Sequence, residues 1–376
     1  MGITDNTEVE ATDTSKEDIA EKSAAFVGRL FEAGLGAFEL LTVYLGDRLG
    51  LYRALHRDGP ATPAELAART GTDERYVREW LEQQAVTGIL AVQNGQADPG
   101  TRVYRLPPEH VDPLVTEESP FHIVPLARFI PSIGGTTSAL LEAFRTGQGV
   151  PYATFGPDAR EGQAGFNRPA FSNLLAKGWL PAVPDVHARL QADPPAKVAD
   201  IACGAGWSSI AIARAYPTVA VDGFDLDEAS IDLARKNADA SGVADRVRFE
   251  VRDASDPALQ GQYDLVLMIE ALHDLGRPVE VLRVLKGLAG ESGTVIIVDE
   301  RVDEVFTAPN ENPVERFMYA VSVLFCLPTG RADGPSPHGT VLRPTQLSAY
   351  ARQGGFGEVE VLPIDYDFFR FYRLHP

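Results

Sequence analysis

The 376-residue chain is long enough for two or three domains with a sizeable core, and 44% hydrophobic with 23% charged residues is an ordinary globular balance. Its 53 acidic and 34 basic side chains give a formal net charge of −19, which argues against bulk binding of nucleic acid or of an anionic membrane surface. No apolar run has transmembrane length, no signal-peptide layout opens the chain, and there are only two cysteines, so we expect a cytoplasmic protein without a membrane span, a disulfide framework or a metal site.

The N-terminal part opens with a polar segment. Residues 1–22 are rich in acidic residues and contain no aromatic residue, so a disordered tail is expected. Between Ala24 and His56 the apolar residues recur at helical spacing, which predicts a long helical region.

A winged helix is predicted within residues 23–118. Thr62 precedes Pro63 and is followed three residues later by Glu65, a pattern typical of an N-cap, a first helical residue and a capping box. A second helix and two short strands follow before residue 107. Helix, turn, helix and hairpin in this order are the winged-helix arrangement.

The charge of the second helix bears on what this domain does. A winged helix domain can bind DNA or mediate protein association, and both functions are considered for this one. The candidate recognition helix carries Glu74, Arg75, Arg78 and Glu79, so it has no cationic excess with which to neutralise phosphates. DNA binding is therefore disfavoured.

Residues 119–185 form the least regular part, interrupted by several prolines and by Gly134-Gly135, with a helix resuming near Leu140. We interpret this segment as a helical linker or lid. Its polar and aromatic side chains are either packing residues between domains or weak candidates for contact with a substrate: Tyr152, Phe166, Asn167 and Trp179.

The stretch around residue 200 organises the C-terminal half. Val198 to Ala202 predicts a short buried strand, and Gly204 and Gly206 allow a tight turn before a helix that starts near Ser208. Such a turn at the end of a strand is the ligand-binding corner of an open α/β sheet.

The residues of this corner distinguish two kinds of cofactor. A dinucleotide site needs a third glycine, but Ser209 occupies that position. Asp200 stands four residues before Gly204, where an acid would repel a pyrophosphate but suits an ammonium or sulfonium group. The pattern D-x-x-C-G-x-G from Asp200 to Gly206 resembles motif I of the class I S-adenosylmethionine (SAM) dependent methyltransferases.

Acidic residues also end the following predicted strands. Asp225 follows the strand of residues 219–224 at the distance that ribose binding requires. Acids recur at the ends of the next three strands, in the order that the resembling family shows: Asp253, Glu270 and Asp299-Glu300. A final hairpin is predicted from residues 358–364 and 368–374.

The resemblance covers residues 186–376 and implies an α/β fold, a doubly wound Rossmann-like sheet of seven strands with a terminal antiparallel hairpin, joined to an N-terminal helical, winged-helix domain. It implies SAM as the cofactor and S-adenosyl-L-homocysteine (SAH) as the product. In relatives of the plant and actinobacterial O-methyltransferase type the N-terminal domain serves dimerisation, so a homodimer through residues 23–118 is expected. The cofactor residues that the resemblance implies are Asp200, Cys203, Gly204, Ala205, Gly206, Asp225, Leu226, Asp253, Ala254, Ile269 and Glu270.

A histidine after the fourth strand is the candidate base. Leu272-His273-Asp274 resembles the L-H-D sequence of plant-type O-methyltransferases, in which the histidine is the base. The match ends there, because the family continues with an aromatic residue and this chain has Leu275. His273 is interpreted as a base or as a structural residue, and Asp299 or Glu300 is expected to orient it or the substrate.

The expected function is methyl transfer from SAM to a small, partly apolar, aromatic or natural-product-like acceptor, at oxygen. Two alternatives stay open. One is a winged-helix transcriptional regulator that senses SAM or a metabolite. The other is a tailoring enzyme of this fold that performs chemistry other than methylation.

Overall fold

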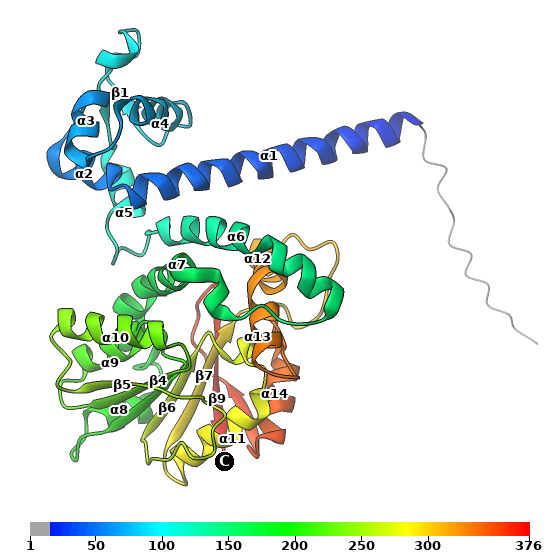
Figure 1. Ribbon diagram of the computed structural model, residues 1–376. Helices are drawn as coiled ribbons and strands as arrows, with labels where there is room; N and C mark the ends of the chain where they lie inside the picture. Colours follow the sequence, from blue (N-terminus) through cyan, green and yellow to red (C-terminus); the bar gives the residue numbers. More distant parts are fainter. Residues whose placement is uncertain (1–15) are drawn as a thin grey trace, which may run out of the picture.

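The computed structural model describes residues 16–376 and is shown in Figure 1. Helix α1 spans Lys16–Arg48, so the prediction of a disordered tail is wrong for residues 16–22. The other residues of the predicted tail, 1–15, lie outside the described part. Glu17 and Asp18 in the first turn favour this start, because acidic side chains complement the positive end of a helix dipole. Within the described residues, no helix has the length and apolarity needed to cross a bilayer.

The winged helix forms as predicted. The Thr62 hydroxyl accepts from the Glu65 N–H, and the Glu65 carboxylate accepts from the Thr62 N–H at 2.8 Å, so the capping box is present. The two short strands pair antiparallel, and Leu66, Leu81 and Tyr104 are buried in the core of this domain. The elements are α2 (Leu51–Asp58), α3 (Pro63–Thr70), α4 (Glu74–Val86), β1 (Ala91–Val92) and β2 (Tyr104–Arg105).

The middle segment is more helical than the prolines predicted. Helix α6 (Val124–Thr146) runs through Pro131 and Gly134-Gly135 without a break. Proline removes one helical hydrogen bond, but α6 packs against both α1 and α7, and this burial outweighs the loss. The other elements of the segment are α5 (Val111–Leu114), η3 (Tyr152–Phe155), α7 (Gly156–Ala170), the π-helical η4 (Phe171–Trp179) and α8 (Pro184–Gln191).

A seven-stranded sheet forms the centre of the C-terminal half, in the order β5-β4-β3-β6-β7-β9-β8. Five strands are parallel, and β9 runs antiparallel between β7 and β8, which confirms the predicted terminal hairpin. The strands are β3 (Lys197–Ile201), β4 (Ala220–Asp225), β5 (Val247–Val251), β6 (Leu265–Ile269), β7 (Thr294–Glu300), β8 (Glu358–Val361) and β9 (Phe369–His375).

Helices cover both faces of the sheet (Figure 1). One face buries apolar side chains of α8, α9 (Trp207–Ala215) and α10 (Glu228–Ser241), and the other those of α11 (Pro278–Ala289) and α14 (Pro344–Gln353). The remaining elements lie beyond the carboxyl ends of β6 and β7: η5 (Leu272–Asp274), α12 (Pro313–Val321), the π-helical η6 (Ser322–Cys326) and α13 (Leu327–Asp333). The chain order reverses between β4 and β6 across β3, so β3 borders the place where such sheets bind ligands.

Candidate active site

The turn after β3 is shaped by its two glycines. Gly206 has φ +78°, and a Cβ atom on it would lie 2.5 Å from the Phe249 ring, so this position requires glycine. Gly204 has φ +52° and open space where a Cβ would point, and its N–H donates to Asp225 Oδ2 at 2.8 Å. The first turn after β3 is therefore tied to the end of β4.

Asp200 is held by the helix that follows the turn. Its Oδ2 accepts from the hydroxyls of Ser208 at 2.6 Å and Ser209 at 2.5 Å. Burial raises the pKa of Asp200 to about 6, although both serines oppose this shift. Ser209, which excluded the dinucleotide pattern, thus serves to hold the acid.

Asp225 stands at the end of β4 with both oxygens engaged by backbone. Oδ1 accepts from the Asp227 N–H at 2.9 Å, and Oδ2 from Gly204. Because a carboxylate oxygen has two lone pairs, each can accept one more hydrogen bond. Burial raises the pKa of Asp225, because the charged carboxylate loses contact with water at this position.

An arginine from α7 reaches across to the same strand end. Arg160 Nε lies 2.6 Å from Asp227 Oδ2, and Asp227 also caps α10 by accepting from the Ser230 N–H. Burial would raise the pKa of Asp227, but the guanidinium and Ser230 hold it below its ordinary value. Helix α7 is therefore fastened over the sheet edge.

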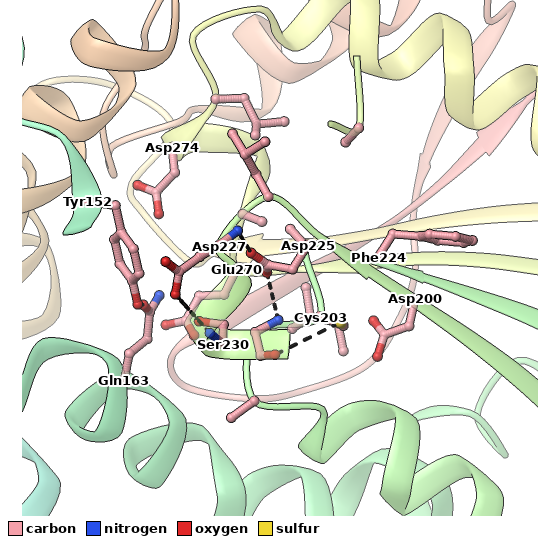
Figure 2. A pocket seen from close by; sticks show the side chains of 18 of the residues that line it. Tyr152, Gln163, Asp200, Cys203, Phe224, Asp225, Asp227, Ser230, Glu270 and Asp274 are labelled. Carbon is pink, nitrogen blue, oxygen red and sulfur yellow. Dashed lines mark hydrogen bonds between the residues drawn. The ribbon is translucent and has the colours of Figure 1, made fainter. Parts of the chain in front are cut away.

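These groups surround one cavity of about 410 Å³ (Figure 2). It is large enough for a cofactor of nucleoside size. Ten predicted cofactor residues line it, and so do two weak substrate candidates: Asp200, Cys203, Gly204, Ala205, Asp225, Leu226, Asp253, Ala254, Ile269 and Glu270, with Tyr152 and Asn167.

Two non-glycine residues in the described chain have positive φ, Ala202 and Glu270, each at 56°. They directly follow β3 and β6, and both line the cavity. Backbone of this kind is unfavourable for a side chain and tends to occur at functional sites. Asn167 of α7 donates a short hydrogen bond to Glu270.

Glu270, at the cavity wall, and the buried Glu300 form an acidic pair. Burial raises the pKa of Glu270 to about 7, while Asn167 and Glu300 oppose the shift. Burial and the proximity of Glu270 raise the pKa of Glu300, whose Oε2 has no hydrogen-bond partner. Two carboxyls in contact retain a proton more readily than either would alone.

His273 lies in a closed cluster. Nδ1 is 2.8 Å from Asp299 Oδ1, and Nε2 is 3.3 Å from Asp274 Oδ1. Burial would lower the pKa of His273, but Asp299 and Asp274 raise it well above its ordinary value. Cys326 also contacts the imidazole, and burial raises the pKa of its thiol to about 12.

Several predicted site residues are absent from the cavity wall. Gly206 packs under the turn, and His273, Asp299 and Glu300 are 2%, 0% and 3% exposed. Trp179 packs in the core among Tyr366, Phe369 and Phe371, and Phe166 meets Phe368 edge-on. The prediction of a substrate contact is therefore not supported for these two aromatic residues, because the sheet hairpin takes up their apolar surface.

The cavity also includes side chains that were not predicted as site residues. Arg160, Asp227, Trp207 and Thr329 line it, and so does Asp274, the last residue of the L-H-D match. Asp227 could have been found, because it follows Asp225 by two residues and precedes a helix. Arg160 and Thr329 come from segments without a recognisable pattern, and only the folded chain brings them to β4 and η5.

The residues present fit SAM. The ends of β3, β4, β5 and β6 present acids to one cavity, which suits a cation with ribose hydroxyls and an adenine amino group. The turn after β3 has an aspartate at its edge, where a pyrophosphate would meet negative charge. A dinucleotide therefore fits this corner poorly.

Comparison with known proteins agrees with this geometry. The model of a methyltransferase domain matches residues 192–322, and that of an Rv2258c-like winged HTH domain matches residues 37–116. The ubiquinone biosynthesis O-methyltransferase of Pseudomonas aeruginosa PAO1 is 29% identical over 175 residues, covering 46% of this chain and 68% of that protein. The Bordetella bronchiseptica protein of the same name is 31% identical over 179 residues, covering 46% and 66%.

Solved structures share the fold over nearly the whole chain. The mitomycin 7-O-methyltransferase MmcR has a TM-score of 0.66 at 20% identity, covering 95% of this chain and 99% of that one. Human N-acetylserotonin methyltransferase, solved in complex with SAM, has a TM-score of 0.66 at 17% identity, covering 93% and 97%.

The matched domain and the relatives, together with the sheet order, support a SAM-dependent methyltransferase. In this chain the methyltransferase domain follows an Rv2258c-like winged helix domain, as the sequence predicted.

Proposed function

We propose that this enzyme transfers the methyl group of SAM to a hydroxyl of a small, partly apolar acceptor. The observation that carries the proposal is the set of acids around one cavity, with Asp225 tied to the glycine turn by Gly204. The acceptor class is supported by the wall, which combines aromatic side chains, Tyr152 and Trp207, with polar ones.

SAM, when bound, supplies an activated methyl group with its own leaving group. We assign the ribose hydroxyls to Asp225, the adenine end to Leu226, Asp253 and Ala254, and the methionine end to the part of the cavity near Asp200 and Glu270. The remaining task of the protein is to align the acceptor and to accept its proton. The candidate groups are His273 with Asp299, as the sequence indicated, and their neighbour Asp274.

We further propose a homodimer through the N-terminal domain. Figure 1 shows α1 extending beyond the elements that pack on its C-terminal part. Its apolar side chains recur along one face and are more than 40% exposed: Phe26, Val27, Leu30, Phe31, Leu35 and Phe38. So much apolar surface is typical of an association face, and a second copy of the chain would cover it.

The regulator alternative is less well supported by the charges of the recognition helix. Arg75 pairs with Glu79 at 2.6 Å, and Arg102 of the wing pairs with Glu82 at 2.8 Å. These basic side chains are therefore already neutralised, where DNA binding needs them free for phosphates.

The test is a calorimetric titration with SAM and with NAD, followed by a screen of small phenols with methyl-labelled SAM. We expect binding of SAM, no binding of NAD, and label transfer to at least one phenol. Binding of NAD in place of SAM would refute the cofactor assignment. SAM binding without transfer to any hydroxyl, amine or thiol in a wider panel would favour the non-methylation alternative.

A further inference from the structure

The predicted base, His273, is closed off from the cavity. Its side chain is 3% exposed, and it is not among the residues that line the wall. Both ring nitrogens face groups of the protein, Nδ1 towards Asp299 and Nε2 towards Asp274, and Cys326 also contacts the imidazole. An acceptor in the cavity therefore meets another side chain first.

That side chain is Asp274. It lines the cavity, is 24% exposed and points into it on the side of Tyr152 (Figure 2). Its Oδ1 is turned inward towards His273 and makes no hydrogen bond. The accessible surface of the carboxylate thus belongs to its other oxygen, and a carboxylate that also interacts with Cys326 keeps lone pairs with which to accept a hydrogen bond from a ligand.

The backbone of Asp274 is held firmly. A Cβ atom on Gly330 would lie 2.7 Å from the Asp274 carbonyl oxygen, so α13 packs directly on this turn. Gly276 packs against the backbone of Gly334, and its N–H donates to Asp333 Oδ2 at 2.8 Å. A carboxylate fixed in this way can be aligned with a reacting hydroxyl.

The charges of His273 and its two carboxylate neighbours indicate which side chain can accept a proton. His273 lies between two carboxylates, Asp299 and Asp274, an arrangement that favours a ring protonated on both nitrogens. An imidazolium cannot accept a further proton. Burial raises the pKa of Asp274, while His273 opposes the shift, so this carboxylate is a better proton acceptor than an exposed one.

We propose that Asp274 is the catalytic residue that contacts the acceptor hydroxyl and takes its proton, and that His273 is a positioning residue that acts through Asp274. This inference rests on the proposed methyl transfer to a hydroxyl. As the acceptor O–H bond breaks, its proton passes to the Asp274 carboxylate. The oxygen electron pair forms the new O–CH₃ bond, and the electrons of the broken C–S bond stay on sulfur. The products are the methylated acceptor, SAH and a neutral Asp274 side chain.

The first test needs no acceptor. Protein labelled with ¹⁵N-histidine is studied by NMR at pH 7.5, with His273→Gln used to assign the signals. We expect both His273 ring nitrogens to show the shifts of an imidazolium, and Asp274→Asn to move them towards the neutral ring. A neutral His273 in the unsubstituted protein would overturn the proposal, because the ring could then serve as the base.

The second test compares two phenols of different acidity, 4-methoxyphenol and 4-nitrophenol, as acceptors at pH 7.5. Asp274→Asn should lower the rate with neutral 4-methoxyphenol by roughly 10²- to 10⁴-fold. It should affect 4-nitrophenol, which is already largely ionised, by less than about tenfold, since little proton transfer remains to be catalysed. The matched control is Asp245→Asn, a carboxylate with a 74% exposed side chain beside Arg246. SAM affinity, measured by calorimetry, should stay the same in both variants.

Equal losses with both phenols would overturn the proposal, because they would indicate a role in binding or folding. If the unsubstituted protein methylates neither phenol, the proposed acceptor class is wrong. The NMR result then decides alone whether His273 is an imidazolium and whether the Asp274 carboxylate stabilises that charge.

Discussion

The imidazole Nδ1 of His273 lies 2.8 Å from Asp299 Oδ1, although the two residues are 26 positions apart in the chain. Asp299 is the penultimate residue of β7, while His273 lies in η5, just after β6. Because β6 and β7 are parallel neighbours, their carboxyl ends bring the two side chains together. The carboxylate fixes the ring orientation and leaves Nε2 to face Asp274.

Replacement of His273 by alanine tests the importance of this pair. We expect turnover to fall by roughly 10²- to 10⁴-fold, because Asp274 loses the neighbouring cation that keeps its carboxylate ionised and in position. SAM affinity should remain nearly unchanged, since His273 does not line the cavity. Single-turnover methylation and calorimetry measure the two effects. The control is His187→Ala, whose ring contacts Tyr216. Near-full turnover in the His273 variant would show that the cluster is structural.

Asp225 is expected to dominate cofactor affinity. The change Asp225→Ala removes the proposed acceptor of two ribose hydroxyls and should weaken SAM binding by roughly 2–3 kcal/mol. The matched control is Asp222→Ala on the same strand, where the carboxylate accepts from the Tyr263 hydroxyl at 3.0 Å. Calorimetric titration gives both affinities. Unchanged SAM binding in the Asp225 variant would contradict the assignment.

The proposed role of the exposed α1 face in dimerisation can be tested by placing charged side chains on it. Phe31 and Leu35 are 64% and 42% exposed, so their replacement by glutamate costs little in the isolated chain. In a dimer the same charges would be buried without partners, which is strongly unfavourable. We expect the parent protein to sediment as a dimer at micromolar concentration and the double variant as a monomer. The control Val361→Glu, on edge strand β8, should leave the dimer intact. A monomeric parent protein would argue against the proposed assembly.

The acidic pair of Glu270 and Glu300 predicts a pH dependence of stability. Because burial raises the pKa of Glu270 from 4.5 to about 7, the folded protein holds a proton that the unfolded chain releases. This contribution is complete below pH ~4.5 and is lost as the pH rises through about 7. Each unit of the shift corresponds to roughly 1.4 kcal/mol of unfolding free energy.

We therefore expect Glu270→Gln, which keeps a neutral side chain, to lose less stability between pH 5 and pH 8 than the parent protein. Urea unfolding at several pH values measures the difference. The control is Glu291→Gln, because Glu291 is exposed in the turn that follows α11. A parallel pH dependence in parent and Glu270 variant would show that the pair does not hold the extra proton.

Local patterns were sufficient for much of this fold. The capping box at Thr62, the alternation in the terminal hairpin and the apolar strands of the sheet depend on short-range preferences, and all are present. The ligand corner was also predictable, because Gly204 and Gly206 precede a helix and acids follow successive strands. Parallel strands necessarily bring their carboxyl ends to one edge.

The local signal failed where packing outweighs propensity. Prolines predicted a broken segment, yet α6 continues through Pro131 because two neighbouring helices bury it. Trp179 and Phe166 read equally well as lid or packing residues, and only the folded chain shows that Trp179 contacts Phe371 and that Phe166 contacts Phe368.

The sequence by itself thus determined the class of this protein, since glycine geometry and strand-end acids follow from residue type and spacing. Only the tertiary structure decided which side chains face the cavity. Arg160 meets Asp227 across 67 residues, and His273 turns away from the wall while Asp274, the next residue, faces it. The physical reason is that side-chain direction at a turn depends on what packs against it, here Asp299 on one side and α13 on the other.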